Sequence, residues 1–85
     1  MSIEEFASEG AGLIIPKNSP WIGLTLKDIC QEYKVIINGY RGKEDYELKA
    51  YNPDVKVKPD IYIEVKGSEE SIRKIFAMHA GSTKN

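Results

Sequence analysis

The chain has 85 residues, a length that allows one domain with a small core. Its 12 basic and 13 acidic side chains give a formal net charge of -1, which argues against nucleic acid as the main partner, because phosphate neutralisation needs a basic excess. The single cysteine, Cys30, cannot form an internal disulfide, which favours a reducing, cytoplasmic compartment. No apolar run approaches the ~20 residues of a membrane helix, so direct membrane insertion is not expected.

The first elements in chain order are a lead segment, a strand and a helix start. Residues 1–10 are weakly amphipathic and interrupted by Ser and Gly, as in a short helix or a linker from a longer protein. Gly12–Ile15 has the pattern of a short buried strand and is ended by Pro16. After a turn-rich connector, Thr25 is expected to act as the N-cap of a helix, with Asp28 completing a variant of the capping box.

The first predicted helix ends near Tyr33. Its apolar side chains fall at positions i, i+3, i+4 and i+7, which is one helical face: Leu26, Ile29, Cys30 and Tyr33. We expect Cys30 to be a core thiol rather than a nucleophile, since no histidine accompanies it in the pattern.

The next strand is predicted over residues 35–41. Three successive apolar residues, Val35–Ile37, indicate that both faces are covered, one of them by a partner chain. Asn38-Gly39 is open to two interpretations: a hairpin turn, or a bulge within a strand that continues through Tyr40 and turns at residues 42–45. We favour the second, because it leaves a strand of ordinary length.

Three further strands are predicted at residues 46–51, 55–58 and 61–66, where apolar and polar side chains alternate. In the last of them Ile61, Ile63 and Val65 should face the core. Gly67 should end this strand, and Ser68 should cap a second helix that ends at Met78 or His79. The expected buried stripe of this helix consists of Ile72, Ile75 and Phe76.

The element order is therefore β-α-β-β-β-β-α. It predicts a small α+β sandwich of two layers, with two helices on one face of a mostly antiparallel sheet. We expect the domain to span residues 11–80, after a linker-like lead of residues 1–10 and before a frayed tail of residues 81–85.

Side chains suited to catalysis are scarce, and we do not expect an enzyme. His79 is interpreted as a surface or C-cap histidine, and the pattern shows no nucleophile–base pair. No spacing indicates a zinc site, and Glu44-Asp45 lacks the converging oxygens that calcium needs, so neither a metal nor a cofactor is expected.

The richest region for binding is Val35–Asp54. Its apolar side chains are suited to contact a purine, and Arg41, beside a glycine turn, is suited to bind a phosphate. The alternative interpretation is that the apolar residues form the core and that Arg41 is an ordinary surface charge.

Two segments together resemble a known family. SPWIGLTLKDI, residues 19–29, is similar to one family signature, and VKVKPDIYIEVKGSEESIRKI, residues 55–75, is similar to a second. In this order and spacing they resemble the TrkA-C domain, or RCK C-terminal domain, the regulatory lobe of potassium channels and transporters. The resemblance covers residues 12–78. The chain departs from the family pattern at Pro59, where glycine is usual, and at Asn38 and Gly39, where apolar residues are usual.

The resemblance implies a homodimer that senses a small ligand, in several members cyclic di-AMP held across the dimer interface. The positions that would line this ligand are Ile36, Ile37, Asn38, Tyr40 and Arg41, with Asn52 and Pro53 from the opposite loop. Arg41 would grip phosphate, and Ile37 and Tyr40 would contact adenine.

Other family members bind no such ligand and serve only in assembly. The alternative function is therefore a purely structural dimerisation module of a transporter, an antiporter or a transcription regulator. The chain lacks the nucleotide-binding lobe that usually accompanies this domain, so it is either part of a longer protein or a free-standing module. The linker-like segment SIEEFASEG, residues 2–10, favours the first. Its association with a membrane would then depend on a transport or channel subunit in that parent protein.

Overall fold

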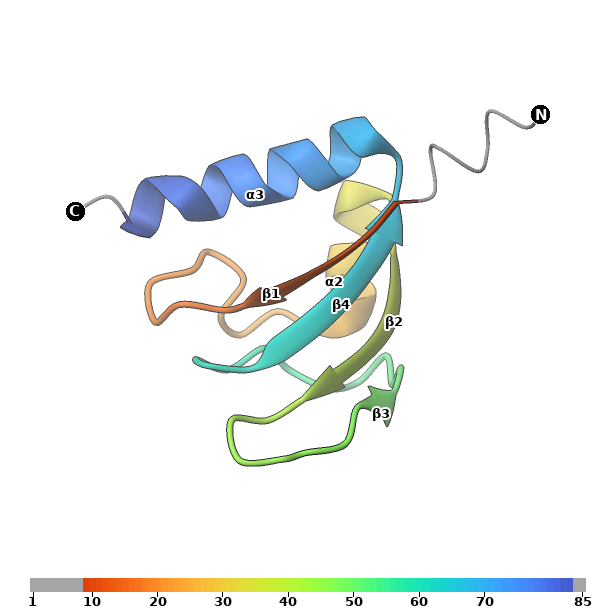
Figure 1. The fold of residues 1–85 in the computed structure, drawn as a ribbon, viewed down its shortest axis with the longest axis vertical. Helices are drawn as coiled ribbons and strands as arrows, with labels where there is room; N and C mark the ends of the chain where they lie inside the picture. The colour runs from red at the N-terminus through yellow and green to blue at the C-terminus, as the bar shows by residue number, and fades with distance from the viewer. Residues whose placement is uncertain (1–8, 84–85) are drawn as a thin grey trace.

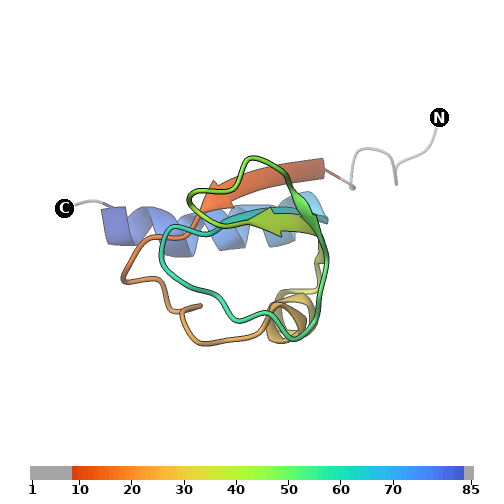
Figure 2. The same cartoon turned by 90° about the horizontal axis from the view of Figure 1, so that it is seen from below.

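The computed structural model describes residues 9–83, with side chains described from Gly10 to His79. The elements follow in the order β1 (Glu9–Ile14), α2 (Leu26–Tyr33), β2 (Ile36–Arg41), β3 (Lys49–Ala50), β4 (Tyr62–Gly67) and α3 (Glu69–Thr83). The four strands form one antiparallel sheet in the order β1-β4-β2-β3 (Figure 1). Both helices lie on the same side of this sheet (Figure 2), so the predicted α+β class is confirmed.

Helix α2 begins and ends as its sequence predicts. The Thr25 hydroxyl accepts a hydrogen bond from the Asp28 N–H at 3.2 Å, and the Asp28 carboxylate accepts one from the Thr25 N–H at 3.0 Å. This reciprocal capping box satisfies two of the free N–H groups at the helix start. At the other end Lys34 adopts a left-handed conformation with φ of 58°, which stops the helix after Tyr33.

Strand β2 continues past Asn38-Gly39, as the favoured interpretation predicts. The register against β4 shifts between Ile37 and Gly39, which marks a bulge. A Cβ at Gly39 would lie 2.7 Å from the Leu48 side chain and from the Lys49 carbonyl oxygen, so only glycine allows β3 to approach this closely. The turn falls at residues 42–45, where the Asp45 N–H donates to the Gly42 carbonyl oxygen at 3.2 Å.

The prediction of five strands is wrong at the third and fourth. Of residues 46–51 only Lys49–Ala50 forms a strand, and Lys56 forms an isolated bridge with Thr25. The backbone of residues 55–57 bonds to the connector before α2 instead of extending the sheet: the Val57 N–H donates to the Leu24 carbonyl oxygen at 2.8 Å. For residues 55–57 the alternation reflects burial against the connector, whereas residues 46–51 are exposed, Tyr46 by 98%, so their alternation marks no buried face.

The predicted ends of the domain also shift. Strand β1 begins at Glu9 rather than at Gly12, because its pairing with β4 extends to Gly67. Helix α3 continues to Thr83, so part of the predicted tail is helical. Residues 1–8 of the predicted lead, and residues 84–85, lie outside the described part of the chain.

The core lies between the sheet and the helices. Its buried apolar members are Leu13, Ile15, Trp21, Leu26, Ile29, Val35, Ile37, Val57, Ile61, Ile63, Val65 and Ile75. The predicted inward positions of the last strand are thus confirmed, and Cys30 packs half buried at the core edge. Phe76 is 39% exposed, so its predicted burial is wrong. Helix α3 turns Ile75 and His79, four residues apart on one helical face, toward the core. Within residues 9–83 no helix combines the length and the apolarity needed to cross a membrane.

Candidate functional site

The sheet face opposite the helices is open to solvent. We call it the outer face; it consists of Gly10, Gly12, Ile14, Ile36, Asn38, Arg41, Tyr62, Glu64 and Lys66. Two large apolar side chains on it are mostly exposed, Ile14 by 64% and Ile36 by 65%. They lie at opposite ends of this face, because Ile14 pairs beside Tyr62 and Ile36 beside Lys66, so each is a single exposed apolar side chain and the two form no continuous patch.

Arg41 is held on the outer face by an aromatic ring. Its guanidinium carbon lies 4.6 Å from the centre of the Tyr62 ring, a cation–π arrangement. The Tyr62 hydroxyl donates to Glu64 Oε2 at 3.1 Å, and Tyr62 itself lies across Gly12, where any Cβ would overlap its ring. Burial, and then the neighbouring Glu64, raise the pKa of Tyr62 above its usual value. The ring is therefore a neutral platform beneath a fixed cation.

Within the described part of the chain no carboxylate neutralises the charge of Arg41. Among residues 10–79 it has no ion-pair partner within 4.0 Å, and its one hydrogen bond is a long contact of 3.5 Å to the Asp45 carbonyl oxygen. A planar guanidinium with free donors is suited to bidentate recognition of a phosphate or a carboxylate.

The turn beside Arg41 is fixed by Asp45. The Gly42 N–H donates to Asp45 Oδ2 at 3.1 Å, and Lys49 Nζ lies 3.3 Å from the same oxygen. The Gly42 hydrogen bond, and then Lys49, lower the pKa of Asp45 below its ordinary value of 3.8. The Asp45 carboxylate thus fixes the turn of residues 42–45, which directly follows Arg41.

We expect the turn at residues 42–45 to loosen in acid. Because the pKa of Asp45 is lowered in the folded state, its contribution is fully present above 3.8 and is lost as the pH falls through the lower folded value. In an NMR titration the Gly42 amide signal should follow the protonation of Asp45, and Asp45→Asn should remove this transition. A Gly42 amide that titrates with a midpoint at or above 3.8 would contradict the assignment.

The seven residues predicted to bind ligand do not form one pocket within a single chain. Ile36, Asn38 and Arg41 belong to the outer face, whereas Tyr40 is half buried against the core. Ile37 is 2% exposed in the core, so its side chain cannot touch a ligand on the outer face. We therefore leave it out of the binding surface.

Asn52 and Pro53 lie on the helix side of the molecule. The Pro53 carbonyl oxygen accepts from the Lys27 N–H at 3.3 Å, which places the loop against the first turn of α2 (Figure 2). The Asn52 side chain accepts from the Asp54 N–H at 3.0 Å, a turn that fixes the exposed loop. This loop can add to the outer face only of a second copy of the chain.

The structure also joins two residues that the sequence pattern leaves apart, Ser19 and His79. Ser19 Oγ lies 2.8 Å from His79 Nε2, and His79 Nδ1 lies 2.8 Å from the Ile75 carbonyl oxygen. A carbonyl oxygen only accepts, so in the neutral imidazole Nδ1 donates to it and Nε2 accepts from the serine. The prediction of a surface or C-cap histidine is wrong, because His79 is 5% exposed.

The Ser19–His79 pair has the spacing of a nucleophile and its base, which the sequence pattern did not reveal. Both side chains are only 5% exposed, and Ser19 Oγ also accepts from the Trp21 N–H at 3.0 Å. A substrate has no open path to this oxygen, so the pair ties the connector to α3. The available signal was the spacing of Ile75 and His79, which puts both on one helical face.

The residues of the two sequence motifs occupy special backbone positions. Gly23, two residues after the buried Trp21, has φ of 92°, in the left-handed region that favours glycine. Asp60 has φ of 70°, and its N–H donates to the Ile15 carbonyl oxygen at 2.7 Å, which locks the turn before β4. The two motifs thus fix two turns on either side of the core.

Neither protein-family models nor curated proteins give a match to this sequence. Among residues 10–79 no three His, Cys, Asp or Glu side chains come together as a metal site. The sequence motifs and the geometry of the outer face therefore carry the functional proposal.

Proposed function

We propose that this chain is a cytoplasmic regulatory domain of a potassium transport or channel system, which dimerises and binds a small phosphate-bearing ligand such as cyclic di-AMP. The observation that carries the proposal is the Arg41 guanidinium, which lies on Tyr62 without a carboxylate partner among residues 10–79, on the same sheet face as the exposed Ile36 and Asn38. Its chemistry agrees with the resemblance of residues 12–78 to the TrkA-C domain.

Each part of this surface suits one part of a cyclic dinucleotide. The guanidinium offers paired donors to a phosphate, and the exposed Ile36 side chain offers apolar contact to a purine. The Asn38 amide, with both donor and acceptor groups, suits the edge of a base. Asn52 and Pro53 would complete the site from a second copy, since in one chain they lie on the other side of the sheet.

Cyclic di-AMP is expected to raise the melting temperature of the wild-type domain, because a ligand that binds only the folded state stabilises it by mass action. At a ligand concentration about 100 times the dissociation constant, the stabilisation is about 2.7 kcal/mol. Arg41→Ala should abolish the shift. Differential scanning fluorimetry at several ligand concentrations measures it.

Arg73→Ala is the matched control, since Arg73 is an exposed arginine on α3 that is paired with Glu69. It should keep the full ligand shift. Absence of any shift for the wild type at millimolar ligand, in a sample shown to be dimeric, would remove cyclic di-AMP as the ligand.

The second candidate function is a purely structural dimerisation module. The exposed Ile36 on β2 favours it, because burying this side chain against a second copy would stabilise a dimer whether or not a ligand binds there. In that case charge placed at Ile36 disrupts the dimer, while cyclic di-AMP leaves the melting temperature unchanged.

A further inference from the structure

A small hollow opens on the outer face, across the strands β1, β4 and β2. We call it the glycine hollow; it has a volume of about 210 Å³ and is lined by Gly10, Ala11, Gly12, Asn38, Glu64 and Val65. Glu64 pairs with Gly12 on one side, and the bulge of β2 brings Asn38 to its other side. The hollow exists because β1 carries glycine at two outward positions, where another residue would project a side chain.

The size of the glycine hollow suits one flat ring. A cavity of about 150 Å³ is enough to hold benzene in a protein interior. At Gly10 a Cβ would meet only the Val65 carbonyl oxygen, at 3.9 Å, so the space beside this residue is open. At Gly12 the ring of Tyr62 takes the place of a side chain, and the same ring carries Arg41. The hollow and the guanidinium are therefore both next to Tyr62.

Glu64 supplies the glycine hollow with a hydrogen-bond acceptor. This half-buried side chain accepts from the Tyr62 hydroxyl through Oε2 at 3.1 Å, which is its one hydrogen bond among residues 10–79. Within the same residues no lysine or arginine lies close enough to form an ion pair with it. The other carboxylate oxygen, Oε1, is thus able to accept from a donor placed in the hollow.

The pair of Asn38 and Glu64 suits adenine better than guanine. An asparagine amide forms two hydrogen bonds with the N6 and N7 edge of adenine. The second N–H of the N6 amino group then points away from N7 and can donate to Glu64. Guanine carries the acceptor O6 in the place of this amino group, which a carboxylate repels. Guanine could give Glu64 donors only from its N1 and N2 edge, and this would turn N7 away from Asn38.

We propose that the glycine hollow seats an adenine ring, with Asn38 on its N6 and N7 edge and Glu64 accepting from its N6 amino group. This inference rests on the proposed function, in which Arg41 binds the phosphate, and it adds Glu64 as the residue that selects the base. Arg41 pairs with Tyr62, and Glu64 lies two residues further along β4, about 7 Å away along the strand. The ribose of one nucleotide bridges such a separation.

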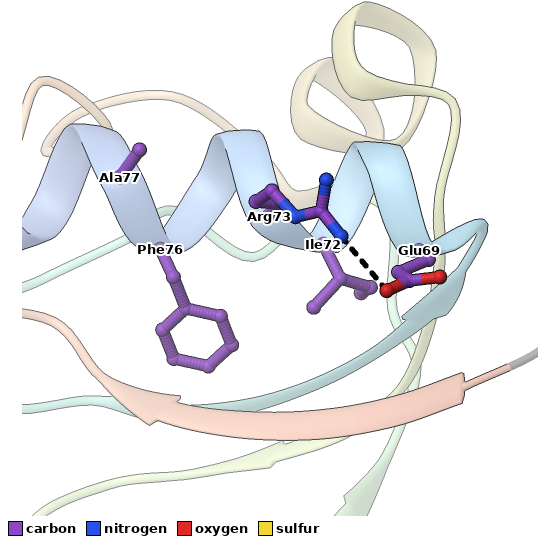
Figure 3. Close-up of a pocket in the computed structure, with 5 residues that line it drawn as sticks. All are labelled: Glu69, Ile72, Arg73, Phe76 and Ala77. Carbon is purple, nitrogen blue, oxygen red and sulfur yellow. Dashed lines mark hydrogen bonds and ion pairs between the residues drawn. The ribbon is translucent and has the colours of Figure 1, made fainter.

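A larger hollow on α3 lacks free groups of this kind. It has a volume of about 500 Å³ and is lined by Glu69, Ile72, Arg73, Phe76 and Ala77. Its two charged side chains, Glu69 and Arg73, form an ion pair with each other at 2.8 Å (Figure 3). Glu69 is therefore a suitable control carboxylate, since it borders a hollow but is already paired.

Isothermal titration calorimetry with cyclic di-AMP and cyclic di-GMP tests the proposal. The wild type should bind cyclic di-AMP at least about tenfold more tightly, as expected for a good bidentate contact to a base. Glu64→Gln should reduce this preference to less than about threefold, because the glutamine amide can donate to O6 while it still accepts from Tyr62. Glu69→Gln should keep the wild-type preference.

A second variant tests the hollow without changing Glu64. Gly10→Leu fills the space beside Val65, and should weaken the binding of cyclic di-AMP at least about tenfold while the domain stays folded. In the NMR spectrum of the wild type, the amide signals of Gly10 and Gly12 should shift when cyclic di-AMP is added. Shifts confined to other residues would place the base elsewhere and overturn the inference.

The calorimetry distinguishes this inference from the proposed function. Equal affinity of the wild type for the two cyclic dinucleotides would overturn the selection of adenine and leave the ligand-sensing function standing. Binding of neither ligand would overturn both. An unchanged preference in Glu64→Gln would show that this carboxylate does not contact the base.

Discussion

Replacing Trp21 by alanine is expected to lower the free energy of unfolding by about 3–5 kcal/mol, the cost of removing a large buried aromatic side chain. Trp21 is fully buried, and its ring lies 5.4 Å from that of Tyr33 and 4.8 Å from that of His79. A domain of this length has about 4–13 kcal/mol of stability in all. The variant should therefore be close to unfolding at 25 °C, as urea denaturation followed by circular dichroism would show.

Two further variants test whether the loss of stability comes from the Trp21 side chain itself or from any substitution in the connector. Ile22→Ala changes the next residue, which is 37% exposed, and should cost much less. Trp21→Phe keeps the aromatic contact and removes Trp21 Nε1, which is buried without a hydrogen-bond partner among the described residues. It should lose less than the alanine variant, because an unpaired buried N–H is itself unfavourable. A Trp21→Ala variant with wild-type stability would show that this packing is not what holds the connector.

Charge at Ile36 is expected to prevent the proposed dimer from forming. Burying this side chain, now 65% exposed, would contribute about 1.5–3 kcal/mol, and Ile36→Asp would instead force a carboxylate out of water. Each 1.4 kcal/mol changes the dissociation constant tenfold, so we expect a rise of at least about tenfold. Sedimentation equilibrium of wild type and variant over a range of concentrations measures it.

Ile22→Asp is the control for this experiment, since it places the same charge at an exposed isoleucine away from the sheet. It should leave the dissociation constant unchanged. A wild-type chain that is monomeric at millimolar concentration would contradict both the ligand-sensing proposal and the structural alternative, since each requires β2 to meet a second copy.

Local patterns in the sequence determined the parts of the fold that depend on near neighbours. The capping box of Thr25 and Asp28, the inward face of β4 and the Ser68 cap, whose hydroxyl accepts from the Ser71 N–H at 3.1 Å, all involve residues a few positions apart. The bulge at Gly39 was also predictable, because a strand of ordinary length required the turn to fall later. For the candidate site, the sequence correctly placed Arg41 and Ile36 on one strand. It did not show which face of the sheet each side chain occupies.

Only the tertiary structure decided the contacts between segments distant along the chain. It brought together Ser19 and His79, which are 60 residues apart. The histidine that the sequence indicated at the surface is therefore part of a buried hydrogen-bonded pair. The tertiary structure bonded residues 55–57 to the connector rather than to the sheet, and it placed Arg41 over Tyr62 and apart from Pro53. The physical reason is that periodicity reports which side of a segment is covered, whereas the covering partner is fixed by the packing of the whole chain.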